Sequence, residues 1–131
     1  MSKITTFYNG DNYFGLFEGL DPHNIKIDLW NVSNVINMFS TFDGCKNFNS
    51  DLSKWDVSKV KNMAFMFKYC ENFNSDLSNW NVSKVEYMRW MFNDCKNFNC
   101  DLSKWDVSNV KNMFDMFGRC NSLTKIPNWY K

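Results

Sequence analysis

DLSKWDVSKVKNMAFMFKYCENFNS, residues 51–75, returns directly as DLSNWNVSKVEYMRWMFNDCKNFNC over residues 76–100. A third copy, DLSKWDVSNVKNMFDMFGRC, begins at Asp101, and residues 26–50 form a looser copy. A repeat of fixed period decides a fold, because each unit is one structural element that stacks on the next. The sequence therefore predicts four repeats of 25 residues, at 26–50, 51–75, 76–100 and 101–125.

The two ends of the chain carry weaker versions of this repeat. Residues 1–25 align with the following unit when they are moved by one period, which places Phe17 on Phe42. We interpret this segment as a degenerate N-terminal capping repeat and residues 126–131 as a shortened C-terminal cap. Atypical end units are expected in a stack, because one side of each end faces water. The chain is thus predicted to be one domain of about five coils.

Within each unit, the spacing of apolar residues predicts a short helix. Ser58 is a good helix N-cap, and Gly19 and Gly44 stand where a left-handed residue often ends a helix. Apolar side chains recur at helical spacing after Ser58, at Val60, Met63, Met66, Phe67 and Cys70. The DLSKW segment predicts a short strand. We therefore expect an α/β repeat, a leucine-rich-repeat-like solenoid of strand–turn–helix coils, with a parallel sheet on one face and short helices on the other.

Three ladders of identical residues run through the units. The first ladder consists of Trp30, Trp55, Trp80 and Trp105. We expect these rings to seal the edge of the core and to stack, and a surface platform that binds carbohydrate is the alternative. We expect the asparagines to lie inside the turns and to satisfy backbone groups there: Asn49, Asn74 and Asn99. We expect the cysteines to be small thiols that face the core: Cys45, Cys70, Cys95 and Cys120.

The residues that could carry chemistry do not form a reactive site. The only histidine, His23, replaces a phenylalanine of the other units, and the cysteines lack the CxxC spacing of zinc sites. Cys100 lies off the cysteine ladder and is expected to be the most exposed thiol. The aspartates of the DLS segments form a row with one charge per coil, which is typical of a solvated edge. We expect no catalysis, no cofactor and no bound metal.

Charge and hydropathy restrict the partners. Fifteen Lys and Arg against 14 Asp and Glu leave a net charge of +1, which argues against nucleic acid or an anionic membrane as the main partner. No stretch approaches the roughly 20 apolar residues of a membrane span, so we expect no direct membrane insertion. A protein partner remains the favoured class.

Comparison of the units predicts the binding surface. Some slots differ from unit to unit, and helical geometry would turn several of them toward solvent. They form the candidate protein-binding surface: Phe65, Tyr69, Tyr87, Arg89, Trp90 and Phe114. The alternative surface is the expected strand side, with Ser53, Lys54, Ser78, Asn79, Ser103 and Lys104. End-to-end self-association through the open ends of the stack is a further expectation.

The pattern DLSxW(D/N)VSxVxxMxxMFxxCxxFN resembles the BspA-like leucine-rich-repeat surface proteins, in the 25-residue form found in mycoplasmas. The resemblance covers residues 26–125 well and residues 1–25 weakly. It implies a solenoid without known catalysis, displayed on the cell surface or secreted, that serves adhesion or host interaction. The alternative is a cytoplasmic protein-interaction scaffold or a self-associating structural protein, because residues 1–10 show neither a signal peptide nor a lipid-attachment cysteine.

Overall fold

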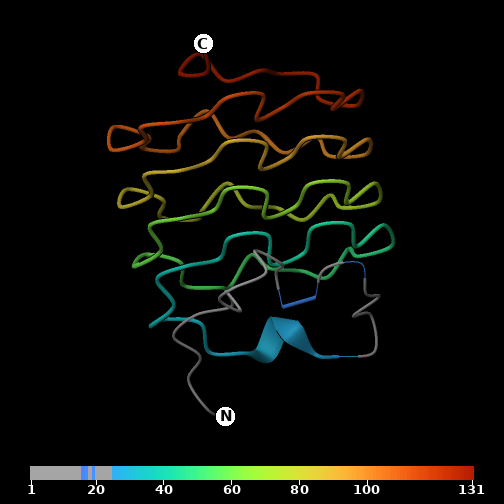
Figure 1. The fold of residues 1–131 in the computed structure, drawn as a ribbon, viewed down its shortest axis with the longest axis vertical. Helices are drawn as coiled ribbons and strands as arrows, with labels where there is room; N and C mark the ends of the chain where they lie inside the picture. Colours follow the sequence, from blue (N-terminus) through green and yellow to red (C-terminus); the bar gives the residue numbers. More distant parts are fainter. Residues whose placement is uncertain (1–15, 18, 20–24) are drawn as a thin grey trace.

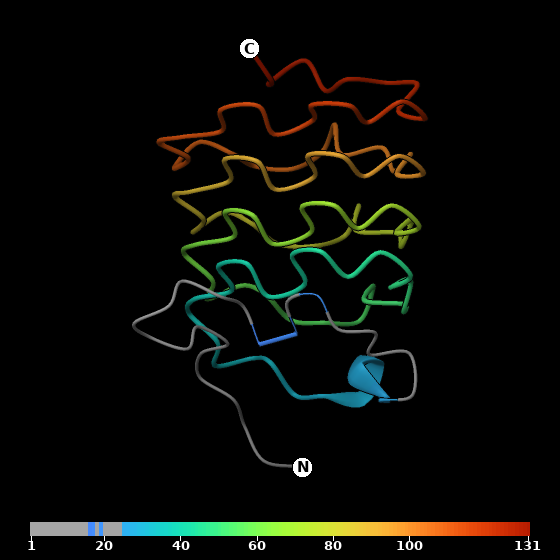
Figure 2. The same cartoon turned by 45° about the vertical axis from the view of Figure 1, so that its right-hand side comes forward.

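The computed structural model describes residues 16–17, 19 and 25–131. The described chain winds into coils that stack along the longest axis, from residues 25–50 near one end to the C-terminal coil at the other (Figures 1 and 2). Parallel bridges join Asn37 to Asn62, Asn62 to Tyr87 and Tyr87 to Asn112. Each bridge joins the same slot of consecutive units, so one sequence repeat makes one coil.

The coils contain very little regular secondary structure. Within the described residues, one 3-10 helix, η3 (Ile27–Leu29), and the three isolated bridges are the regular elements. The α/β architecture expected from the sequence, with a parallel sheet and a layer of short helices, is therefore wrong.

The backbone of residues 58–70 explains why no helix forms. The Ser58 amide donates to Asp56 Oδ1 at 3.0 Å, which makes a local turn and not a helix cap. Phe65 and Tyr69 have φ values of 61° and 63°, which a right-handed helix does not allow. Alternate amides donate to the next coil, as from Phe67 to the Met91 carbonyl at 2.9 Å. These amides are therefore not available to donate to the carbonyl four residues earlier, as an α-helix requires.

The apolar spacing belongs to successive β-turns. The Met66 amide donates to the Met63 carbonyl at 3.2 Å, and the Cys70 amide donates to the Phe67 carbonyl at 2.9 Å. Each of these bonds closes a four-residue turn whose first and last residues are buried in the core. A separation of three residues is shared by β-turns and helices, and this ambiguity misled the sequence interpretation.

The expected strand is likewise folded into a turn. In DLSKW, the Ser53 amide donates to Asp51 Oδ1 at 2.9 Å, and the Trp55 amide donates to the Leu52 carbonyl at 3.1 Å. The carboxylate of the aspartate replaces a backbone acceptor, as in an Asx turn. This bend leaves no extended run that could pair as a strand.

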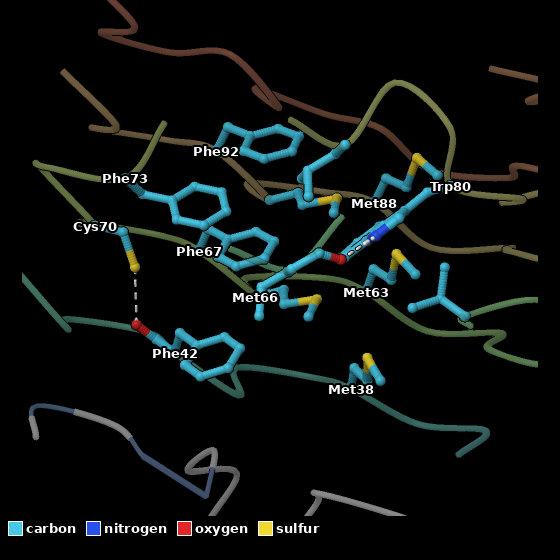
Figure 3. Close-up of a cluster of buried hydrophobic side chains, with 14 of the residues drawn as sticks. Met38, Phe42, Met63, Met66, Phe67, Cys70, Phe73, Trp80, Met88 and Phe92 are labelled. Atoms are coloured by element: carbon cyan, nitrogen blue, oxygen red, sulfur yellow. Dashed lines mark hydrogen bonds between the residues drawn. The ribbon is translucent and has the colours of Figure 1, made fainter. Parts of the chain in front are cut away.

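Phenylalanine rings fill the core in two parallel stacks. In the first, neighbouring ring centroids are 5.6–5.8 Å apart with nearly parallel planes: Phe17, Phe42, Phe67, Phe92 and Phe117. In the second, Phe48, Phe73 and Phe98 repeat at 5.7–6.0 Å. Within a coil the two stacks meet at 4.2 Å, as between Phe67 and Phe73 (Figure 3). Phe17 lies in register with the coils, whereas His23 and most of residues 1–25 lie outside the described residues.

Candidate functional site

A row of three aromatic side chains crosses the surface of three consecutive coils. The ring centroids of Phe39 and Phe65 are 5.3 Å apart, and those of Phe65 and Trp90 are 5.2 Å apart. All three rings are partly exposed. Tyr69 stands beside this row with 44% of its surface exposed.

Two cations lie on these rings. The Lys68 ammonium is 4.3 Å from the centroid of Trp90 and 4.7 Å from that of Tyr69. The Arg89 guanidinium is 5.1 Å from the centroid of Phe65. Such cation–π contacts fix the position of a charge without neutralising it. We refer to this group as the aromatic patch, which consists of Phe39, Phe65, Lys68, Tyr69, Arg89 and Trp90.

The backbone at three patch residues has a left-handed conformation. The φ values are 61° at Phe65, 63° at Tyr69 and 56° at Trp90. Glycine adopts this conformation at no steric cost, and Gly44 occupies the slot of Tyr69 in the preceding coil with φ 78°. A bulky side chain there costs on the order of 1–2 kcal/mol. The same two slots are also left-handed outside the patch, at Ser40, Asp94, Asp115 and Arg119, so the turn belongs to the fold. The large aromatic side chains placed on it are what distinguish the patch.

Two shallow depressions flank the patch. One, of about 250 Å³, is lined by Phe39, Asn62, Ala64, Tyr87, Arg89 and Asn112. The other, of about 380 Å³, is lined by Lys68, Tyr69, Trp90, Asn93, Asp94, Asp115, Gly118 and Arg119. In the second depression, Asn93 donates to Asp115 Oδ2 at 2.8 Å, and Arg119 pairs with Asp94 at 3.7 Å. The patch is therefore a ridge between two hollows and not a closed pocket.

The structure brings together four of the six residues that the sequence nominated for binding. Phe65, Tyr69, Arg89 and Trp90 belong to the patch, and Tyr87 lines the depression beside Arg89. Phe114 lies one coil further on and is 69% exposed.

Sequence reasoning missed Phe39 and Lys68. Phe39 occupies the same variable slot as Arg89, and this shared slot is the signal that could have identified it. The position of Lys68 over Trp90 depends on the left-handed turns, and no sequence pattern indicates it.

The tryptophan ladder is part of the core and not a surface platform. Trp55, Trp80 and Trp105 are buried, and Trp30 is partly exposed. The Trp80 indole nitrogen donates to the Leu52 carbonyl of the preceding coil at 2.9 Å (Figure 3). Trp105 repeats this bond, and its ring stacks on that of Trp80 at 6.5 Å. The buried rings of Trp55, Trp80 and Trp105 offer no face to a carbohydrate.

The cysteine ladder also joins coils. Four thiols each donate to the carbonyl of a phenylalanine in the preceding coil at 2.8–3.0 Å: Cys45, Cys70, Cys95 and Cys120. The bond from Cys70 to the Phe42 carbonyl is drawn in Figure 3. Burial raises the pKa of the Cys70 and Cys95 thiols well above the usual value, and raises the pKa of Cys120 to about 12. Cys100 is only partly exposed, and burial raises its pKa as well. The folded chain therefore carries weakly reactive thiols.

The asparagine ladder lies at the surface, contrary to the expectation that it would lie inside the turns. Asn49, Asn74 and Asn99 are exposed. The Asn74 backbone N–H donates to Asn49 Oδ1 at 2.8 Å, and the Asn99 backbone N–H donates to Asn74 Oδ1 at 2.8 Å. Each side chain thus satisfies a backbone donor of the next coil. Asn47, Asn72 and Asn97 form a second ladder through their side chains, which the sequence analysis did not identify.

The alternative surface carries the aspartate row. A depression of about 370 Å³ is lined by Asn74, Ser75, Asp76, Ser78, Asn99, Cys100 and Asp101. Hydrogen bonds from Ser103 and Lys125 lower the pKa of Asp101 to about 2. Hydrogen bonds from Ser78 lower the pKa of Asp76. These carboxylates are stabilised as anions within their turns, which does not suit general acid–base catalysis.

The part of the chain that the structure describes contains no group of three or more metal-ligating side chains. In the same residues, no helix has the length and apolar character needed to cross a membrane.

The fold and the surface define a repeat protein built from stacked coils of 25 residues. A family model described as "Mycoplasma protein of unknown function, DUF285" matches residues 11–129. The chain therefore belongs to this family. No curated protein and no solved structure is significantly similar to the chain.

Proposed function

We propose that this chain is a non-catalytic module that binds another protein through the aromatic patch. The observation that carries the proposal is the left-handed backbone at Phe65, Tyr69 and Trp90. Glycine would stabilise these turns better, so the large side chains are not explained by the fold. Their partly exposed rings, with cations on them, have the composition of protein-binding hot spots, which are rich in Trp, Tyr and Arg.

We further propose that the chain acts in the manner of the BspA-like surface repeat proteins, as an adhesion or host-interaction module outside the cell. The sequence pattern and the family membership support this proposal. The alternative is an intracellular interaction scaffold. Cys70, Cys95, Cys100 and Cys120 favour it because they form no disulfide, as is usual in reducing compartments.

The binding proposal is tested by capture of proteins from host-cell and producer-cell extracts on the immobilised chain. The test variant is Phe65→Ser with Trp90→Ser. The matched control is Leu29→Ser with Ile126→Ser, which removes two exposed apolar side chains outside the patch. We expect the wild type and the control to capture the same partner, and the test variant to lose it.

Thermal unfolding of each variant accompanies this capture. Loss of the partner by a test variant that remains folded supports the proposal. Equal capture by the test variant would place the binding site elsewhere. Protease treatment of intact producing cells separates the two locations, because only a surface protein is cleaved while a cytosolic marker stays intact.

A further inference from the structure

We infer that the partner presents an acidic peptide segment, in which carboxylates stand next to apolar side chains. This inference rests on the proposed function of the aromatic patch. It assigns the chemistry of the partner from the cations that form no ion pair among the residues the structure describes.

The first observation is that the cations of the patch form no ion pair with a carboxylate of the described residues. Lys68 and Arg89 form no ion pair with any described residue. Both are held against aromatic rings, which restricts their side chains before a partner arrives. A carboxylate that reaches them would form charge-assisted hydrogen bonds at a reduced cost in conformational entropy.

The second observation is that basic residues dominate the same face. The segments that carry the patch hold seven Lys or Arg and four Asp or Glu: residues 33–45, 58–70, 83–95 and 108–120. The carboxylates of this face are themselves engaged: Glu86 pairs with Lys111, Asp94 pairs with Arg119 and Asp115 accepts from Asn93. Within the described residues, this face therefore carries more cations than carboxylates.

A basic depression extends the patch along this face. It has a volume of about 300 Å³ and is lined by Lys61, Lys84, Glu86, Asn109 and Lys111. Lys61 directly precedes Asn62, which lines the depression beside Arg89. Lys61 and Lys84 also lack an ion pair with described residues. A segment that crosses the patch would therefore meet four cations that form no ion pair within the described part of the chain: Lys61, Lys68, Lys84 and Arg89.

The spacing of charges favours a peptide over a nucleic acid. Duplex DNA carries one phosphate charge for roughly every 1.7 Å of its axis, so it suits a continuous basic surface. Here Glu86, Asp94 and Asp115 interrupt the cations and would repel such a uniform polyanion. A peptide can place a few carboxylates at the cations and apolar side chains against the exposed ring edges.

The experiment selects binders from a random peptide library on the full chain, and measures labelled winners by fluorescence anisotropy. The charge-reversal variant is Lys68→Glu with Arg89→Glu, and its matched control is Lys54→Glu with Lys104→Glu on the aspartate side. We expect winners rich in Asp and Glu with at least one large apolar residue. Their affinity should fall about tenfold or more in the charge-reversal variant, remain in the control and weaken with added salt.

The outcomes separate this inference from the proposed function. Winners that lose binding to Phe65→Ser with Trp90→Ser, but are not acidic and tolerate charge reversal, would overturn the inference and leave the patch as a binding site. Winners that tolerate both patch variants would overturn both proposals. Failure to select any peptide, while protein capture succeeds, would overturn the inference alone. Displacement of acidic winners by single-stranded DNA of equal charge would show general polyanion binding and also overturn it.

Discussion

Alkaline pH should destabilise this protein through its buried thiols, and Cys120 allows the effect to be calculated. Burial raises the Cys120 pKa to about 12 in the folded chain, against ~8.5 for an unfolded cysteine. The folded state thus holds this proton more tightly than the unfolded state. Below the unfolded pKa both states are protonated, so the contribution of Cys120 to stability is fully present. Between the two pKa values this contribution falls by about 1.4 kcal/mol per pH unit.

At pH 11 the calculated loss from Cys120 alone is about 3 kcal/mol, which is a large share of the ~5–15 kcal/mol that stabilises a typical domain. The test compares the wild type with Cys120→Ser, which keeps a donor for the Phe92 carbonyl but does not titrate in this range. The free energy of unfolding is measured in urea by tryptophan fluorescence at several pH values. Lysine and tyrosine ionisation is common to both proteins and cancels in the difference.

The wild type should lose stability relative to Cys120→Ser by about 3 kcal/mol between pH 8 and pH 11. Parallel pH profiles for the two proteins would refute the reasoning, since they would show that Cys120 titrates alike in the folded and unfolded states. Cys70 and Cys95 are more deeply buried, and their pKa values are raised in the same direction by the same cause. The free energy of unfolding of the wild type should therefore fall more steeply with rising pH than the Cys120 contribution alone predicts.

Phe67→Ala should lower the free energy of unfolding in urea by about 3–5 kcal/mol, because the Phe67 ring lies between Phe42 and Phe92. Phe117→Ala should lower it by less, because the Phe117 ring is 8% exposed. Equal losses would contradict the stacked core. Asn74→Ala should cost about 0.5–1.5 kcal/mol despite its exposure, because the Asn99 amide loses its acceptor, and an unchanged urea midpoint would argue against that bond. Native alkylation with iodoacetamide near neutral pH should modify Cys100 before the ladder thiols, and mass spectrometry of a limited digest identifies the site; early modification of Cys70 would contradict its burial.

The repeat itself could be predicted from the sequence, and the path of the backbone within it could not. The return of Trp55 as Trp80 and Trp105 defined the length of one coil, and the structure places these residues one above another. The spacing of Met63, Met66 and Cys70 suits a helix and a series of β-turns equally well. Tertiary hydrogen bonds between coils decide between them, and no local pattern reports such bonds.

Left-handed backbone was the second feature that the sequence concealed. Gly19 and Gly44 indicated it at one slot, and their φ values of 68° and 78° agree with that indication. In the later coils the same slot holds Tyr69 and Asp94, which give no such signal. The predicted surface included Phe65 and Trp90, which lie together in the structure, but lacked Lys68, whose place over Trp90 follows from these turns.

The same geometry explains why the variable residues can form a binding surface without weakening the core. Rings such as Phe67 are stacked on identical neighbours at 5.6 Å, so a change in one coil leaves two neighbours without their contact. The left-handed residues Phe65, Tyr69 and Trp90 lie on turns whose amides already bond the next coil, and their side chains remain at least partly exposed. Substitutions there change the surface while the stack is kept. The aromatic row begins at Phe39 and ends at Trp90. In the next coil Asp115 occupies the slot of Trp90 and accepts a hydrogen bond from Asn93. The residue chosen at this slot in each coil therefore limits the length of the patch.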